Sequence, residues 1–232
     1  MPVLDLSPLE LEALALSLRV AFWSVLTSLP AGLLMAWVLA RREFYGKSAL
    51  NAVIHLPLVL PPVVVGYLLL VLLGREGPLG RLLYDLFGVG LPFTWEGAAL
   101  AAAVMAFPLM VRAMRLSLEG VDRRLEAAAR TLGARPFGVF LTITLPLMAP
   151  GIVVGALLGF ARSLGEFGAT ITFAANIPGE TRTLPLALYT LTQTPGGEGA
   201  ALRLAALSVA LSLAALAASE YAARRLRARN GT

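Results

Sequence analysis

The chain has 232 residues, of which 58% are hydrophobic and only 14% are charged, and its mean hydropathy is +0.78. These values exclude a soluble globular domain and predict an all-α protein that crosses a membrane several times. The net charge is +5, but the basic residues flank apolar runs, which argues against nucleic acid as a partner. Because cysteine is absent and histidine occurs once, no metal site is expected.

Five largely uncharged stretches are long enough to cross about 30 Å of hydrocarbon as helices. We therefore expect a single membrane domain over residues 1–232, with a short interfacial helix that begins near Ser7 ahead of the first span. Pro57, Pro61 and Pro62 predict a kink or a break in the second span. The expected spans are residues 13–40, 49–73, 97–118, 144–166 and 204–223.

Basic residues are unevenly divided between the two sets of loops that five spans create. The loop at 41–47, the segment at 112–135 and the C-terminal tail together contain thirteen Lys and Arg residues, whereas the opposite loops contain three. Cytoplasmic loops of membrane proteins carry an excess of Lys and Arg. The distribution therefore predicts that the N-terminus lies outside, that the C-terminus lies inside, and that the 112–135 segment is cytoplasmic.

The cytoplasmic segment, residues 119–146, is the least apolar part of the middle of the chain. A strong helix-forming run, LEAAARTL, is followed by Gly133, which interrupts the helix. The sequence then returns to apolar residues through Ile143-Thr144-Leu145-Pro146. A charged insert of this kind is useful to a membrane protein that a soluble partner must grip from the cytoplasm.

This insert resembles the EAA loop of binding-protein-dependent importers of the ATP-binding cassette (ABC) superfamily. The family pattern is EAA, three residues, Gly, nine residues and I-x-L-P, and its last four fixed positions match here at the same spacing. The alanine triplet occupies the EAA positions, and the glutamate is displaced by one residue. The residues that the resemblance assigns to ATPase coupling are Glu126, Ala127, Ala128, Ala129, Arg130, Leu132, Gly133, Ile143, Leu145 and Pro146.

The resemblance extends over nearly the whole chain. In particular, the block from Phe160 to Glu198 is similar to the permease subunit of bacterial molybdate importers, and less so to sulfate and thiosulfate permeases. It implies a type I ABC importer permease, multi-pass in the bacterial cytoplasmic (inner) membrane, that is not itself an enzyme and binds no cofactor. The implied partners are a second permease copy, two cytoplasmic ATPase subunits that carry ATP-Mg, and an external oxyanion-binding protein.

The fourth span contains two further features. Gly151, Gly155 and Gly159 recur every four residues and predict close helix packing. Arg162 and Glu166, four residues apart, either line or gate the outer pathway or form an ion pair that satisfies itself. The candidate pathway or gate residues are Arg162, Glu166, Thr170 and Asn176.

Two other classes of protein were weighed. An ion-coupled secondary transporter commonly contains inverted repeats, whereas this chain has no convincing internal repeat and five spans divide badly into two halves. A membrane enzyme needs an acid/base or metal cluster, and the expected spans hold none. Both classes are therefore less well supported than the permease.

Overall fold

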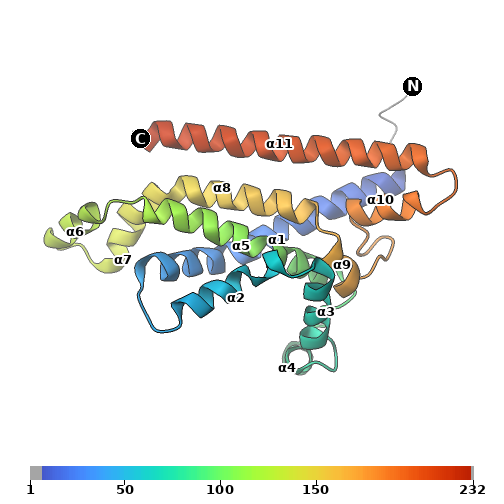
Figure 1. Ribbon diagram of the computed structural model, residues 1–232, viewed down its shortest axis with the longest axis horizontal. Coiled ribbons are helices and arrows are strands. Elements are labelled where there is room, and N and C mark those ends of the chain that lie inside the picture. The colour runs from blue at the N-terminus through green and yellow to red at the C-terminus, as the bar shows by residue number, and fades with distance from the viewer. Residues whose placement is uncertain (1–6, 231–232) are drawn as a thin grey trace.

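The computed structural model describes residues 7–230, and most of these residues are helical. Three long helices, α1 (Pro8–Arg41), α5 (Trp95–Glu119) and α8 (Leu145–Leu164), form a bundle along the long axis of the molecule, and α11 (Glu198–Asn230) lies along it (Figure 1). Helix α5 is central, because it packs against both α1 and α8, whereas α11 packs on α8. The all-α class expected from the sequence is confirmed.

Helix α1 is continuous from its first turn to its last. Ser7 caps it: its Oγ accepts the N–H of Glu10 at 3.3 Å, and the Glu10 carboxylate accepts the Ser7 N–H at 2.6 Å. The expectation of a separate interfacial helix before the first span is wrong. No glycine or proline occurs between Pro8 and Pro30, so nothing in the sequence interrupts the helix there.

The second expected span, residues 49–73, is broken in two. Helix α2 (Lys47–Val59) and helix α3 (Pro62–Leu73) meet at an angle of 117°. Leu60 is extended, with φ −71° and ψ 144°, because it precedes Pro61, and neither Pro61 nor Pro62 has an N–H to continue the helix. Of the expected kink or break, the structure has the break, and this stretch is not one straight span.

Four helical runs in the described part of the chain are long and apolar enough to cross a membrane, and the bent pair α2–α3 makes a fifth if it counts as one span. The run that corresponds to the expected span 144–166 begins at Pro136, earlier than expected, because α7 (Pro136–Val139) and the π-helical turn η1 (Phe140–Thr144) lead directly into α8. The remaining helices are short: α4 (Pro78–Phe87), α6 (Arg123–Thr131), α9 (Gly168–Phe173) and α10 (Leu184–Thr192).

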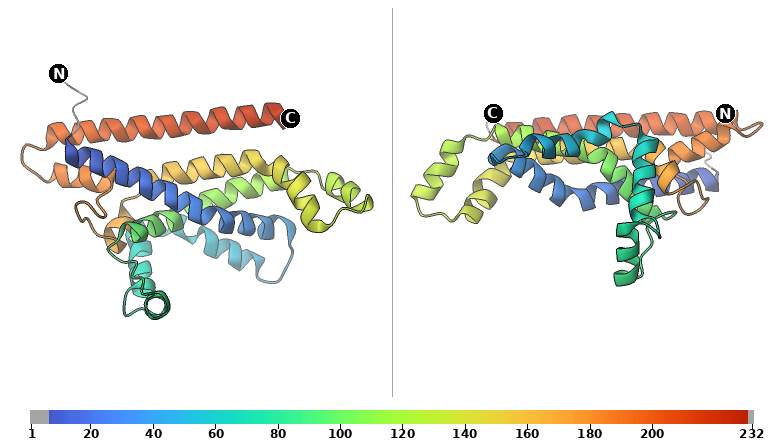
Figure 2. Two further views of the ribbon diagram at one scale, coloured as in Figure 1. Left: turned by 180° about the vertical axis from the view of Figure 1, so that it is seen from behind. Right: turned by 60° about the horizontal axis from the view of Figure 1, so that its bottom comes forward.

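The loops gather at opposite ends of the bundle. The α1–α2 loop, the α6–α7 segment and the C-terminal end of α11 lie at one end, and α10 and the first turn of α1 lie at the other (Figures 1 and 2). Helices α3 and α4 project from the side of the bundle. The three basic segments therefore lie at the same end of the bundle, as the distribution of Lys and Arg in the sequence predicted. That this end faces the cytoplasm stays a prediction.

The core is built around one face of α5. Met110, Met114 and Leu118 are fully buried there, together with Leu39 of α1 and Met148 of α8. The unbranched, flexible methionine side chains suit the irregular space between the packed helices. This core fixes the C-terminal half of α5 between α1 and α8, directly beside the α6–α7 segment.

Candidate functional site

Residues 122–139 form an exposed hairpin, which we call the α6–α7 hairpin. Asp122 caps α6, its Oδ1 accepting the N–H of Arg124 at 2.9 Å. Gly133 follows α6 with φ +89°, a left-handed conformation that residues with a side chain rarely adopt. Pro136 begins α7. The cap, the glycine and the proline therefore define where each of the two helices starts and stops.

Glu126 ties this hairpin to the bundle. Its Oε1 accepts a hydrogen bond from Arg41 Nη2 at 2.9 Å and another from Thr144 Oγ1 at 2.8 Å. The Arg41 and Glu126 side chains are only 10% and 14% exposed. One carboxylate thus joins α6 to the last turn of α1 and to η1.

The displacement of the glutamate has a geometric consequence. Successive residues of an α-helix are rotated by about 100°, so a shift of one residue moves a side chain to a different face. Ala127, at the position where the family pattern has its glutamate, is exposed, whereas Glu126 is turned inward onto Arg41. Ala128 and Arg130 are also exposed, and Ala129 is half-buried.

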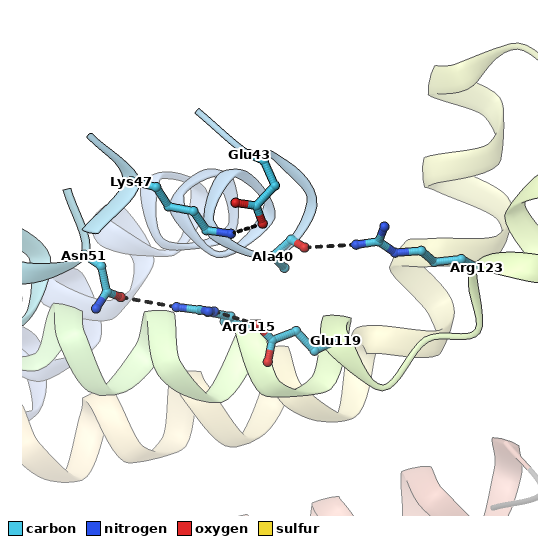
Figure 3. Close-up of polar contacts among 7 residues, drawn as sticks. All are labelled: Ala40, Glu43, Lys47, Asn51, Arg115, Glu119 and Arg123. Carbon is cyan, nitrogen blue, oxygen red and sulfur yellow. Dashed lines mark hydrogen bonds and ion pairs between the residues drawn. The ribbon is translucent and has the colours of Figure 1, made fainter. Parts of the chain in front are cut away.

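Further polar contacts join the same end of the bundle (Figure 3). Arg123 Nη2 donates to the carbonyl oxygen of Ala40 at 3.4 Å, which is a second contact between α6 and the end of α1. Arg115 on α5 donates to Asn51 Oδ1 on α2 at 3.2 Å and also pairs with Glu119 at 2.7 Å. Side chains at this end therefore connect α6 with α1, and α5 with α2.

The I-x-L-P part of the motif forms the junction between the hairpin and the fourth span. Ile143 lies in η1, and Leu145 and Pro146 begin α8. The Leu145 N–H bonds to the carbonyl of Phe140, five residues back, as in a π-helical turn. Pro146 lacks the N–H that would continue regular α-helical bonding, which favours a widened turn before it.

The three glycines of the fourth span lie where α8 meets α5. A Cβ at Gly151 would be 2.1 Å from Ser117 Cβ, one at Gly155 would be 3.1 Å from the Met110 carbonyl oxygen, and one at Gly159 would be 2.7 Å from the Met110 side chain. The bundle is thus close-packed at this crossing because α8 presents hydrogen atoms in place of side chains.

Arg162 and Glu166 form an ion pair with an Nη1–Oε2 distance of 2.6 Å. The Glu166 side chain is 1% exposed, and its other oxygen accepts the N–H of Ala169 at 2.8 Å, at the start of α9. Thr170 is buried beside it and donates to the carbonyl of Phe167 at 2.9 Å. Both oxygens of Glu166 are therefore engaged within the subunit, and a role of these residues in the pathway stays a prediction.

Asn176 belongs to a different cluster. Its Nδ2 donates to Thr190 Oγ1 at 2.9 Å, and its Oδ1 accepts from Arg182 Nε at 2.9 Å. These contacts hold the loop before α10 against α10 itself. The structure thus brings Arg162, Glu166 and Thr170 together and leaves Asn176 outside that group.

Two residues of the hairpin junction were not singled out from the sequence. Arg41 was counted only as a charge that sets topology, and Thr144 was the variable residue within Ile143–Pro146. The sequence signal for Thr144 was weak, because a threonine hydroxyl in a helix often bonds to a nearby backbone carbonyl and does not by itself indicate a side-chain partner. Their shared contact with Glu126 requires the fold, because Arg41 is 85 residues away from Glu126 in the chain.

Removing Arg162 tests whether the pair is structural. Arg162→Ala leaves the buried Glu166 carboxylate without a cation, so we expect the variant to lose about 3 kcal/mol of stability, as when one partner of a buried ion pair is removed. The double variant Arg162→Met, Glu166→Gln removes both charges and is expected to recover stability and uptake. Thermal unfolding and uptake in proteoliposomes measure these effects. A strong loss of uptake in a stable double variant would assign the pair to the pathway.

A substitution at Gly133 tests the hairpin turn. No atom lies within 4 Å of a Cβ built at Gly133, so the obstacle is the positive φ and not space. Gly133→Val is expected to destabilise the turn by about 1 to 3 kcal/mol and to abolish binding of the ATPase that the resemblance implies, whereas Gly133→Asn, which tolerates this conformation, retains most of that binding. Co-purification of the ATPase measures binding, with Gly138→Ala, also in open space, as the control. Normal binding by Gly133→Val would contradict a defined turn.

Comparison with known proteins identifies the group to which this fold belongs. The family model described as "binding-protein-dependent transport system inner membrane component" matches residues 28–228. The chain belongs to this family. It is therefore the membrane component of a transport system, a multi-pass inner membrane protein, as the sequence predicted.

Relatives within this family are similar along almost the full chain. The "molybdenum transport system permease protein ModB" of Escherichia coli (strain K12) is 64% identical over 222 residues, 96% of this chain and 97% of that protein. The ModB of Haemophilus influenzae is 57% identical over 223 residues, with the same coverage of each chain. A "probable sulfate transport system permease protein" of Chlorella vulgaris is 35% identical over 171 residues, 74% of this chain and 64% of that protein.

Solved structures confirm the architecture. A bacterial ABC transporter involved in the import of the acidic polysaccharide alginate superposes with a TM-score of 0.75 over 96% of this chain and 81% of that chain. The two sequences are 18% identical, so the comparison bears on the fold alone. That fold is the one expected for an ABC importer permease.

Proposed function

We propose that this protein is the transmembrane permease subunit of an ATP-driven importer of molybdate. The identity of 64% with a molybdenum transport permease over nearly the full length of both chains carries the proposal. The sulfate permease relative is less similar and is matched over a smaller part of its length, which favours molybdate over sulfate. Tungstate, a tetrahedral dianion of the same charge, is a second candidate substrate.

Two copies of the chain would form the pathway, with two ATPase subunits on the cytoplasmic side and an oxyanion-binding protein outside. The α6–α7 hairpin is the part that supports contact with an ATPase, because it extends from the bundle at the end where the basic loops gather (Figure 2). Closure of the ATPase pair on ATP would move the hairpins, and with them the helices, between inward-open and outward-open states.

The energetics explain why such a system is driven by ATP. Bringing a divalent anion inward against a membrane potential of about 100 mV costs roughly 4 to 5 kcal/mol, at about 2.3 kcal/mol per charge. A scarce substrate adds a concentration term of the same sign. A passive channel would therefore release such an anion and would not accumulate it.

Reconstitution tests this function directly. The permease, its ATPase and the binding protein are placed in proteoliposomes, and uptake of radioactive molybdate is measured with and without ATP. We expect uptake that needs ATP and the binding protein, and that excess tungstate inhibits more than excess sulfate. Uptake driven by a proton or sodium gradient without ATP would support a secondary transporter, and preferential uptake of sulfate would support the sulfate alternative.

The orientation of the chain is tested by single cysteines, since the natural sequence contains none. Ala128→Cys lies on the exposed face of α6, and Glu180→Cys lies in the exposed loop before α10. In intact cells stripped of the outer membrane, a membrane-impermeant maleimide is expected to label Glu180→Cys and to label Ala128→Cys only after the membrane is broken. The reverse pattern would invert the predicted topology.

A further inference from the structure

Both acidic residues of the α6–α7 hairpin are already engaged within the subunit. Asp122 caps α6 at the base of the hairpin, and Glu126 is held by Arg41 and Thr144. Sequence positions 123–139 contain no other Asp or Glu. Asp122 is exposed at the base of the hairpin, but residues 127–139 contain no carboxylate, although the family pattern places a glutamate at Ala127.

Three arginines of the same hairpin are exposed and unpaired. Among residues 7–230, Arg124, Arg130 and Arg135 make no ion pair and no side-chain hydrogen bond, in contrast to Arg123, which donates to Ala40. A guanidinium group binds a carboxylate through two parallel hydrogen bonds, and Arg is enriched at protein interfaces. These three side chains are available for such contacts.

Large apolar side chains lie exposed on the same short segment. Leu132 is 88% exposed and Phe137 is 72% exposed, on either side of the turn at Gly133, and Leu125 on α6 is 48% exposed. Exposed apolar side chains on a protruding hairpin mark an interaction surface, and aromatic and arginine side chains are enriched among the residues that dominate binding to a protein partner.

We infer that the ATPase cleft that receives this hairpin is apolar at its centre and carries carboxylates at its rim. This inference rests on the proposed function and adds the chemistry of the partner surface. The displaced glutamate supports it: with Glu126 turned toward Arg41, the exposed charged side chains of α6 and of the turn that follows it are all arginines. If the cleft were instead lined with basic residues, their charges would repel the three unpaired arginines of the hairpin and weaken binding.

The test measures binding of the cognate ATPase to the full-length permease in nanodiscs of zwitterionic lipid. Charge-reversed variants Arg124→Glu, Arg130→Glu and Arg135→Glu are compared with Arg81→Glu, which is 65% exposed on α4, away from the hairpin. We expect each hairpin variant to bind about tenfold or more weakly, because attraction becomes repulsion, and the control to bind within about twofold of the natural protein. Affinity is also expected to fall as salt is raised, less steeply in the hairpin variants.

Each outcome decides a different question. Unchanged or stronger binding by the hairpin variants, in samples that elute as a single species with the natural unfolding temperature, would overturn the inference. A loss of binding that occurs only when anionic lipid is added to the nanodiscs would assign the arginines to the membrane surface and would also overturn it. Failure of the natural permease to bind any ATPase would instead count against the proposed function.

Discussion

Glu126→Ala is expected to destabilise the junction between the hairpin and the bundle and to separate ATP hydrolysis from uptake. The change removes the only ion pair of Arg41 in the described chain, and Arg41 is 10% exposed with an Nε atom that already has no hydrogen-bond partner there. A cation left unpaired in such a site costs about 3 kcal/mol. Without this contact α6 keeps its own helical structure but loses its strongest connection to α1.

Two measurements check this expectation: the unfolding temperature of the permease, and the amount of molybdate imported for each ATP hydrolysed. Glu119→Ala provides the matched control, because Glu119 is also paired with an arginine at this end of the bundle but is 42% exposed. Its loss is expected to cost less than about 1 kcal/mol. Glu126→Gln should lie between the two, since an amide oxygen can still accept from Thr144. Natural stability together with natural coupling in Glu126→Ala would show that the contact is dispensable.

Gly151→Ala is expected to force α5 and α8 apart. The new Cβ would be 2.1 Å from Ser117 Cβ, 2.7 Å from Ser117 Oγ and 3.0 Å from the carbonyl oxygen of Ala113, so at least one of the helices must move. Overpacking a core contact costs about 1 to 3 kcal/mol, and this contact includes backbone, which cannot rotate away. The displacement would also disturb the hydrogen bond from Ser117 Oγ to the Met148 carbonyl.

Thermal unfolding of purified variants measures the effect, and two further variants sharpen it. Gly199→Ala lies in α11 with no atom within 4 Å of its Cβ, so it is expected to leave stability unchanged or to raise it slightly. Ser117→Gly combined with Gly151→Ala removes the clashing Ser117 side chain and should recover part of the loss, which a double-mutant cycle quantifies. Equal stability of Gly151→Ala and Gly199→Ala would contradict the close approach of α5 and α8.

The sequence predicted the helices better than their ends or connections. Apolar length identifies residues 97–118 within α5, although Arg112 and Arg115 lie near one end of this stretch, because a lipid-crossing helix needs about twenty predominantly apolar residues. Proline at 61 and 62 announced a disturbance but not a bend of 117°, since the angle depends on how α3 packs against α9. The start of α1 was also mispredicted. The acidic residues before residue 13 suggested a separate interfacial helix, but no glycine or proline interrupts the chain between Pro8 and Pro30, and the helix is continuous.

For the candidate site, the local sequence pattern predicted the turn at Gly133 but not which side chains contact Glu126. Gly133 and the I-x-L-P spacing marked the hairpin and the start of α8 from the sequence alone. Glu126 was assigned to the coupling loop by its place in the motif, but its contacts with Arg41 and Thr144 depend on the distance between segments that only the fold brings together. Likewise the spacing of Arg162 and Glu166 suggested a pair, whereas the second role of Glu166 in capping α9 required the structure.

The unbroken α1 has a mechanical consequence. With 34 residues at 1.5 Å each it is about 50 Å long, and both of its ends are held. At one end Arg41 binds the hairpin; at the other, Glu10 pairs with Arg203 of α11 at 3.0 Å, and Ser17 Oγ accepts the N–H of Leu184 at 2.6 Å. A rod of this length acts as a lever: a tilt of about 5° moves one end by about 4 Å relative to the other. A tilt of this size would displace α10 and its loop by more than the width of a water molecule.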